Sequence, residues 1–211
     1  MIVFGGNIII KIKQINKKDL SKLAEFSSIG MHFDRYTKSK FLEKMYSEYL
    51  IRYEYSHATV ALGAYDDNNQ FRGAIFGRFN NEVLVDQGLF NKNYSTLANR
   101  IVNIGFGSES GVYDQVNAEM LRELEKKMKL DGELSLFAVD PEANGQGVGS
   151  KLLSELSRRY SGKNIYLYTD SNCTYQFYEH RGFIRDFAVR AHEPSQPLNQ
   201  KMTYFIYHKK L

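Results

Sequence analysis

Apolar and polar residues alternate in several short runs of this chain, and such alternation is typical of strands that bury one face. Two largely apolar runs, 58–65 and 71–79, flank the turn sequence DDNNQ, and this strand–turn–strand order predicts a β-hairpin. Further strands are expected at 8–15, 133–139, 164–170, 183–189 and 202–209.

Other runs repeat their apolar residues every three or four positions, as amphipathic helices do. One helix is expected over 17–29. Asn16 would cap its start, and Asp19 would lie in its first turn, where the helix dipole favours a negative charge. A second is expected from about 39 to 53. Its apolar face would contain Phe41, Leu42, Met45, Tyr49 and Leu50.

Residues 80–131 break this rhythm, with a glycine-rich piece, GFGSESG, before a strongly helical one, YDQVNAEMLRELEKKMKL. We expect a mostly helical insert here. A helix with inward Leu152, Leu153 and Leu156 should follow at 150–160, and a short helix at 173–180 should end at Gly182 in a left-handed cap. Strands mixed with helices predict a single α/β (α+β) domain over 1–211, with an insert at about 80–131.

Composition narrows the function classes. The chain has 211 residues, 43% of them apolar, which is enough for one substantial core, and its formal net charge of +4 is mild. The N-terminal lysines form no block, so nucleic-acid binding is not expected. No metal-ligand spacing, signal peptide or 18-residue apolar run is present. A single cysteine indicates a reducing compartment, so we expect a cytoplasmic protein without a membrane segment or a metal.

The segment FAVDPEANGQGVGSKLL, residues 137–153, is the most informative in the chain. A predicted strand runs through glycines at 145, 147 and 149 into a predicted helix. Unpaired N–H groups at the start of a helix bind anions, and glycines let the backbone approach closely. The spacing matches neither the nucleotide P-loop nor the dinucleotide fingerprint. The functional interpretation is that the loop binds a phosphate group of another kind of ligand. The alternative is a tight strand-to-helix turn that binds no ligand.

A second segment, YTDSNCTYQFYEHRGF at 168–183, has an asparagine, a tyrosine six residues later and then Gly-Phe. The two segments together resemble motif A (133–160) and motif B (164–183) of the GNAT superfamily of N-acetyltransferases. The resemblance implies the GNAT fold, with a mixed, mostly antiparallel sheet and helices on both faces. Its fourth and fifth strands (133–139 and 164–170) would be splayed, and the helical insert would lie between the third and fourth strands.

The resemblance also implies that acetyl-CoA, as cosubstrate, lies between the splayed strands. Its pyrophosphate would meet the backbone amides of the glycine loop, and its pantetheine arm would pair with the strand before the loop. The implied cofactor-binding residues are Phe137, Ala138, Val139, Asn144, Gly145, Gln146, Gly147, Val148, Gly149, Ser150 and Asn172. Asn144 departs from the family pattern, which usually has arginine or glutamine there.

Two residues are candidates for proton transfer. Tyr178 matches the tyrosine that the family commonly uses as general acid toward the departing thiolate, although it would also suit aromatic packing. Glu133 matches a glutamate that histone-type members use as general base, and a water chain is the alternative. Strand alternation predicts that Glu133, Ser135 and Phe137 share one face. Cys173 has no readable His/Asp partners and is not expected to act as a nucleophile.

The acceptor is expected to be a primary amine of a small molecule. The protein is expected to be a monomer or a homodimer. Carboxylates of the insert are candidates to attract it, or are simply solvated. Two other functions stay open: a non-catalytic acyl-CoA-binding sensor of the same fold, and a protein N-acetyltransferase.

Overall fold

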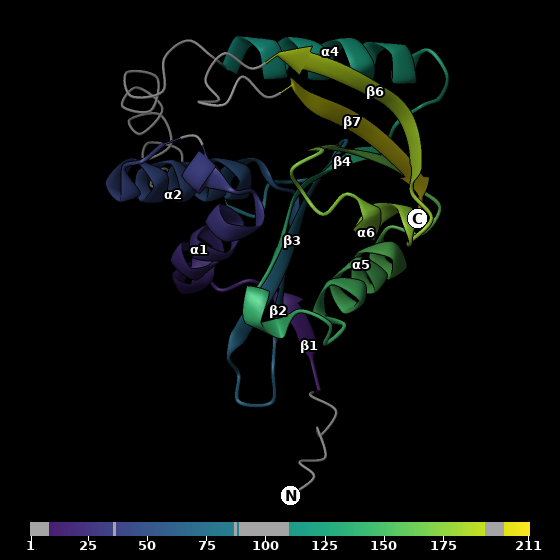
Figure 1. Ribbon diagram of the computed structural model, residues 1–211. Coiled ribbons are helices and arrows are strands. Elements are labelled where there is room, and N and C mark those ends of the chain that lie inside the picture. The colour runs from purple at the N-terminus through teal and green to yellow at the C-terminus, as the bar shows by residue number, and fades with distance from the viewer. Residues whose placement is uncertain (1–8, 36, 87, 89–109, 193–200) are drawn as a thin grey trace, which may run out of the picture.

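The computed structural model describes residues 9–35, 37–86, 88, 110–192 and 201–211. Their strands form one seven-stranded sheet in the order β1-β2-β3-β4-β5-β7-β6 (Figure 1). Every neighbouring pair is antiparallel except β4 and β5, which are parallel. The strands are β1 (Lys11–Gln14), β2 (Val60–Tyr65), β3 (Phe71–Phe79), β4 (Gly132–Val139), β5 (Asn164–Asp170), β6 (Ile184–His192) and β7 (Lys201–Lys210). This arrangement confirms the predicted mixed, mostly antiparallel sheet.

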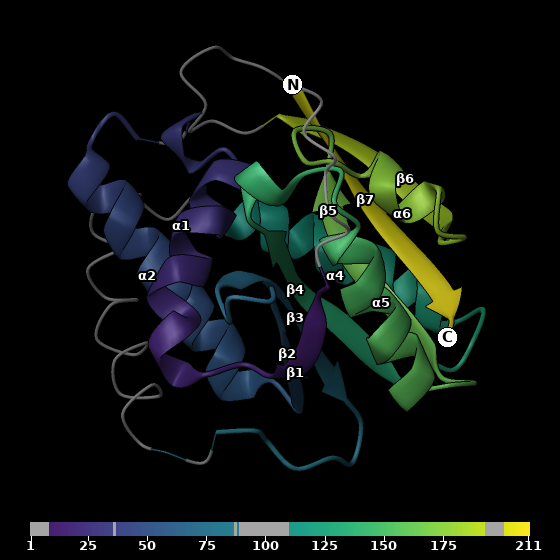
Figure 2. The same ribbon diagram turned by 90° about the horizontal axis from the view of Figure 1, so that it is seen from below.

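Helices cover both faces of the sheet. Figures 1 and 2 show α1 and α2 on one face and α5 on the other. The face covered by α1 and α2 also packs against α4, and we call it the α2 face. The face covered by α5 also packs against α6, and we call it the α5 face. The helices are α1 (Leu20–Gly30), α2 (Lys40–His57), α4 (Ser110–Glu125), α5 (Val148–Arg159) and α6 (Gln176–Glu179). Three 3-10 turns lie at Lys17–Asp19, Phe33–Arg35 and Pro141–Ala143.

Helix α5 follows its prediction closely. Leu152, Leu153 and Leu156 are at most 4% exposed and pack against β3, β4 and β5. Gly162 then adopts a left-handed conformation with φ of 83° just past the helix, and Gly182 does the same with φ of 76° beyond α6. Both glycines stand where the sequence predicts that a helix stops.

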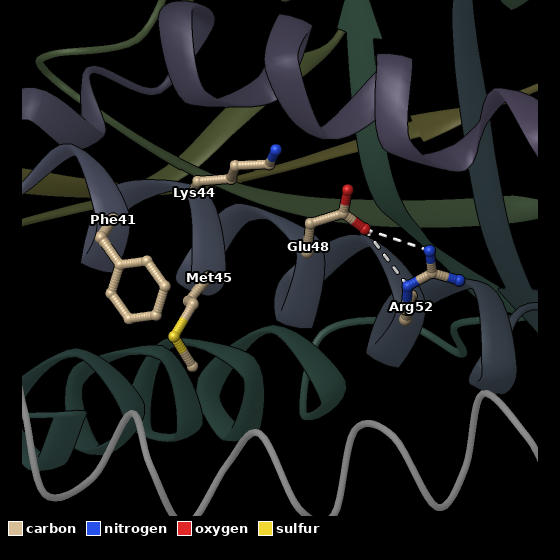
Figure 3. A pocket seen from close by; sticks show the side chains of 5 residues that line it. All are labelled: Phe41, Lys44, Met45, Glu48 and Arg52. Atoms are coloured by element: carbon tan, nitrogen blue, oxygen red, sulfur yellow. Dashed lines mark hydrogen bonds and ion pairs between the residues drawn. The ribbon is translucent and has the colours of Figure 1, made fainter.

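Helix α2 is longer than predicted and buries a different face. Ser39 caps it, because its Oγ accepts a hydrogen bond from the Leu42 amide at 3.4 Å. The predicted apolar face is wrong: Phe41 is 72% exposed and lines an open pocket with Met45 (Figure 3). The buried positions include hydroxyl and carboxyl side chains, which a hydrophobic pattern does not count. They are Ser47, Ile51, Glu54, Tyr55 and Ser56.

The start of α1 also differs in detail. Asn16 does not cap by accepting a bond; its Nδ2 donates to Asp19 Oδ2 at 3.1 Å and to the Tyr65 hydroxyl at 2.9 Å. The structure thereby begins this segment with a 3-10 turn before α1.

The insert is seen in part. The helix expected at 113–130 is α4, which packs against β7 through Val116, Met120 and Leu124. Residues 89–109, with most of the glycine-rich piece, lie outside the described residues. Within the described ranges, no helix has the length and apolar character needed to cross a membrane.

Candidate active site

Strands β4 and β5 separate almost at once. They pair only at Gly132 with Ile165 and at Glu133 with Tyr166. Beyond these pairs β4 stays bonded to β3, and β5 stays bonded to β7 through Asp170. The edge of β4 that faces β5 is therefore free of strand pairing over residues 134–139, within the part of the chain that the structure describes. An extended ligand could pair with this main-chain edge as a further strand does.

A β-bulge lies beside this opening. The neighbouring β3 residues Phe76 and Gly77 pair with Leu136 and Leu134, so Ser135 is an extra residue in β4. The bulge changes which residues share a face.

Glu133 lies on the α2 face, where it meets Arg78 and Glu54, whereas Phe137 packs on the α5 face against Phe177 and Tyr178. The prediction that Glu133, Ser135 and Phe137 share one face is thus wrong. An extra residue reverses the alternation of a strand.

The three glycines of the loop between β4 and α5 have two different roles. Gly145 and Gly147 have φ of 79° and 76°, a left-handed conformation that other residues rarely adopt, and a Cβ at either would meet nothing within 4 Å. Gly149 instead packs closely, since a Cβ there would stand 3.1 Å from the Phe177 ring. The first two glycines leave open space beside the helix start, and the third lets α5 approach α6.

The amides of the loop are only partly free for a ligand. Gln146 N–H already donates to the Ala143 carbonyl at 3.2 Å, so its predicted role in gripping the pyrophosphate is not supported. In α5 the first backbone bond runs from Lys151 N–H to the Gly147 carbonyl at 3.0 Å. The amides of Val148, Gly149 and Ser150 precede that bond and have no carbonyl of their own helix to reach.

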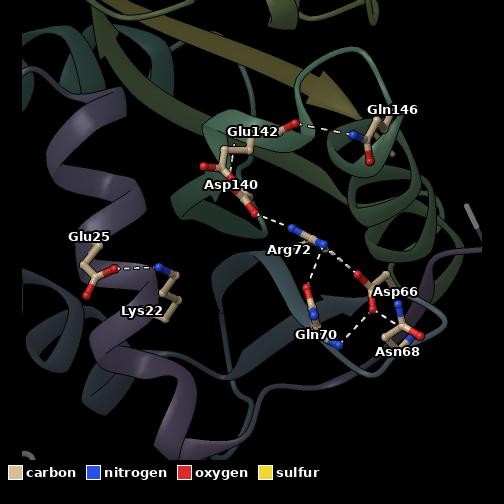
Figure 4. A network of polar contacts seen from close by, with 9 residues as sticks. All are labelled: Lys22, Glu25, Asp66, Asn68, Gln70, Arg72, Asp140, Glu142 and Gln146. Carbon is tan, nitrogen blue, oxygen red and sulfur yellow. Dashed lines mark hydrogen bonds and ion pairs between the residues drawn. The ribbon is translucent and has the colours of Figure 1, made fainter.

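Arg72 of β3 holds the beginning of the loop (Figure 4). Its guanidinium bridges Asp66 Oδ2 at 2.8 Å and Asp140 Oδ2 at 2.9 Å. Asp140 also accepts the Glu142 amide at 3.0 Å, which fixes the turn that leads into the glycines. Sequence reasoning missed this contact, because Arg72 lies 68 positions before Asp140.

Arg181 places a cation beside the first turn of α5. Its Nη2 donates to Ser150 Oγ at 2.5 Å, and its guanidinium carbon stacks 3.9 Å from the centre of the Phe177 ring. The side chain is half-buried. Sequence reasoning missed Arg181 as well, although it lies within the predicted second motif.

Tyr178 lies on the α5 face among four aromatic rings. The ring centroids are 5.5 Å away for both Phe177 and Phe183, and 6.3 Å away for both Phe137 and Tyr207. Burial raises the pKa of the Tyr178 hydroxyl, so the group stays protonated at neutral pH and retains a proton that it can donate.

The two residues near the end of β5 have local partners. The Asn172 amide side chain donates to Met202 Sδ at 3.6 Å, so in this structure it contacts β7. Burial, and then the charge of Asp170, raise the pKa of the Cys173 thiol to about 12. A thiol with so high a pKa is a poor nucleophile, in agreement with its predicted lack of a role.

An ionic triad occupies the α2 face next to the opening. Arg78 Nη2 contacts Glu54 Oε2 at 2.5 Å, and Arg78 Nη1 contacts Glu133 Oε2 at 3.4 Å. The side chains of Glu54 and Glu133 are only 12% and 18% exposed. Burial raises the pKa of both carboxyl groups against the lowering effect of Arg78. Sequence reasoning named Glu133 and missed its two partners, which come from α2 and β3.

The carboxylates of the insert that are candidates to attract the acceptor are Glu82, Asp86, Glu109, Asp114 and Glu119. Three of them have partners within the protein, and Glu119 accepts a hydrogen bond from the Gln115 side chain at 3.1 Å. Asp86 pairs with Lys17 at 2.8 Å, and Glu82 accepts the Tyr160 hydroxyl at 2.8 Å. Glu109 lies outside the described residues. Glu54 of α2 and Glu133 of β4 also place carboxylates beside the opening.

Comparison with known proteins indicates the domain and the fold to which these residues belong. Residues 99–185 match the family model of the acetyltransferase (GNAT) domain, which spans the opening, the glycine loop and α6. Comparison with the curated proteins gives no match.

Solved structures share the fold over nearly the whole chain. One of histone acetyltransferase HPA2 and related acetyltransferase from Corynebacterium glutamicum has a TM-score of 0.59 at 16% identity, and the match covers 93% of this chain and 94% of that chain. An N-acetyltransferase from Staphylococcus aureus has a TM-score of 0.53 at 18% identity, covering 94% and 100%. The structure of Arabidopsis thaliana NAA60 in complex with a bisubstrate analogue has a TM-score of 0.54 at 12% identity, and the match covers 95% of this chain and 97% of that chain.

At these sequence identities the likeness to solved structures shows the fold alone. The family model adds a match to the acetyltransferase (GNAT) domain over residues 99–185. Residues 99–185 of the chain are therefore similar to the GNAT acetyltransferase domain, and the chain as a whole shares the fold of solved acetyltransferases. The resemblance seen in its two motifs is thereby confirmed.

Proposed function

We propose that this chain, as a single domain over residues 1–211, transfers the acetyl group of acetyl-CoA to the primary amine of a small molecule by direct attack. The observation that carries the proposal is the early separation of β4 and β5 beside a helix start with free amides. The single cysteine fits action in a reducing compartment such as the cytoplasm.

The residues present fit acetyl-CoA. The unpaired β4 edge at Phe137, Ala138 and Val139 suits the amide groups of a pantetheine arm. The amides of Val148, Gly149 and Ser150, with the space beside Gly145 and Gly147, suit a pyrophosphate. Asn144, which is exposed at the loop, and Asn172 remain predicted contacts.

When bound, acetyl-CoA supplies the thioester carbon at which the new N–C bond forms and the C–S bond breaks. Glu133, on the α2 face, accepts the proton that the amine must lose. Tyr178, on the α5 face, donates its hydroxyl proton to the departing sulfur. The opened sheet lies between the two groups, so acid and base act from opposite sides.

The charge on the α2 face favours a cationic acceptor. Glu54 and Glu133 share one guanidinium, which gives a net charge of −1 when both are ionised. An alkyl ammonium ion has a pKa near ~10.4 and arrives protonated, so a neighbouring carboxylate both attracts and deprotonates it.

A panel of amines with acetyl-CoA, monitored by release of the free thiol, tests the function. The panel contains polyamines, amino sugars, aminoglycosides, amino acids and short peptides with free N-termini or lysines. We expect thiol release with at least one small amine. Release with peptides alone would indicate a protein N-acetyltransferase, and CoA binding without release on any amine would indicate a sensor.

Arg181→Gln is expected to weaken CoA binding about 10- to 150-fold, because a hydrogen bond from a charged donor contributes about 1.5–3 kcal/mol. Calorimetry with CoA and with pantetheine, which lacks phosphates, measures the effect. Pantetheine should bind both proteins equally, and Arg190→Gln, an exposed arginine of β6, should bind CoA like the parent. Equal CoA affinity in Arg181→Gln would remove Arg181 from the phosphate site.

A further inference from the structure

Glu54 is a buried carboxylate of α2 that the reaction outlined above does not use. The residue is 9% exposed, and its carboxylate reaches from α2 to Arg78 of β3, the strand that pairs with β4. Burying an ionised carboxylate is expensive unless it is paired. Arg78 supplies the pairing, and the Arg78 Nε atom is itself buried without a hydrogen-bond partner.

The two carboxylates compete unequally for this guanidinium. Arg78 lies 2.5 Å from Glu54 and 3.4 Å from Glu133, so Glu54 has the closer pairing. Arg78 also lies 5.8 Å from the centre of the Tyr53 ring, on the same turn of α2 as Glu54, which holds the guanidinium toward that helix. Glu133 is left with a long contact to the cation that would otherwise bind its oxygens directly.

We propose that Glu54 is a positioning residue for the transfer: by holding Arg78 on α2, it keeps the Glu133 carboxylate available to accept the proton of the amine. This inference rests on the proposed function of Glu133 as the base. It adds a reason why a glutamate beside an arginine retains enough basicity to act, since a tight ion pair with arginine would make it a weak base.

The surroundings of Glu133 favour this control by Glu54. Burial is the largest influence raising the pKa of Glu133; Arg78 lowers it and the Glu54 charge raises it again. Burial raises the pKa of Tyr166 on β5, and the Glu133 charge adds to that shift, so the two groups lie near each other. The charged and titratable groups that interact with Glu133 are Glu54 of α2, Arg78 of β3, and Tyr166 and Tyr168 of β5. Around these partners, Tyr53 of α2 interacts with Arg78, Glu125 of α4 interacts with Tyr166 and Tyr168, and Tyr113 of α4 interacts with Tyr168.

Two variants should shift the acid limb of the pH profile of kcat/KM in opposite directions. In Glu54→Gln, Arg78 is released to Glu133 and a negative charge is lost, and both changes lower the pKa of Glu133. The limb, where activity is lost as Glu133 takes up a proton, should move to lower pH by about one unit. In Arg78→Gln the cation is lost, so the pKa of Glu133 rises and the limb should move to higher pH.

Glu48→Gln is the matched control, since Glu48 is a half-buried carboxylate of α2 that pairs with Arg52 at 3.2 Å. Its profile should coincide with that of the parent. A titration of the Glu133 carboxyl carbon by NMR, assigned through Glu133→Gln, measures the same pKa without turnover and also reports on folding of each variant.

The outcomes separate the two proposals. If the Glu133 pKa falls in Glu54→Gln and rises in Arg78→Gln but no amine is acetylated, the control of the Glu133 pKa by Glu54 through Arg78 is supported and the proposed function fails. If the parent is active and the Glu133 pKa is unmoved or raised in Glu54→Gln, the inference is overturned.

Discussion

Glu133→Gln is expected to lower kcat/KM by about 10²–10⁴, the usual contribution of a positioned acid or base. Glutamine has nearly the same shape, and its carbonyl oxygen can keep the contact with Arg78 that the carboxylate makes at 3.4 Å. It cannot take up a proton. Steady-state kinetics with the best amine of the panel, over a range of pH, measure the loss.

CoA affinity should be unchanged in the same variant, because Glu133 is the second residue of β4 whereas the loop proposed to bind the pyrophosphate follows the other end of this strand. Glu123→Gln is the control for the substitution itself, since Glu123 is an exposed carboxylate of α4 paired with Lys126. A loss smaller than tenfold would assign the proton transfer to a water chain and would leave Glu133 a structural partner of Arg78.

The acid limb of the parent enzyme provides a second check on this role. Burial raises the pKa of Glu133, so its basic form is lost at a higher pH than that of an exposed glutamate. Activity should therefore fall as the pH drops through this raised pKa, and the limb should be absent from the residual activity of Glu133→Gln.

The sequence was sufficient for elements whose periodicity is set locally. The strand at 164–170 and the three inward leucines of α5 are found as predicted, because alternation and helical spacing are properties of a single segment. The glycine-rich turn between β4 and α5 was also predictable as a turn, since its conformation depends on residues within a few positions of each other.

Features that depend on two distant segments were not predictable. The bulge at Ser135 exists only relative to the register of β3, so nothing in the β4 segment itself distinguishes it from a regular strand. For the same reason the triad was missed: Arg78 and Glu54 are 24 positions apart, and each is an ordinary charged residue in its own segment. Strand alternation therefore gave the wrong neighbours for Glu133, because it placed Phe137 on the same face.

Tyr178→Phe is expected to lower kcat tenfold or more and to leave CoA affinity nearly intact. Phenylalanine keeps the ring among Phe137, Phe177 and Phe183, so the variant removes only the hydroxyl. The matched control is Tyr175→Phe, one turn earlier, whose ring packs 4.9 Å from Phe205. The control should keep its rate.

A change of leaving group separates proton donation from packing. The hydroxyl matters because the departing thiolate, with a pKa of roughly 8.5 if it resembles cysteine, gains from a donor. A selenoester analogue of acetyl-CoA leaves as a more acidic selenol and needs less protonation. The defect of Tyr178→Phe should shrink with this analogue if the hydroxyl is the donor. An equal defect with both substrates, or an unchanged kcat with acetyl-CoA, would leave Tyr178 only a packing role in the aromatic cluster between α5 and β7.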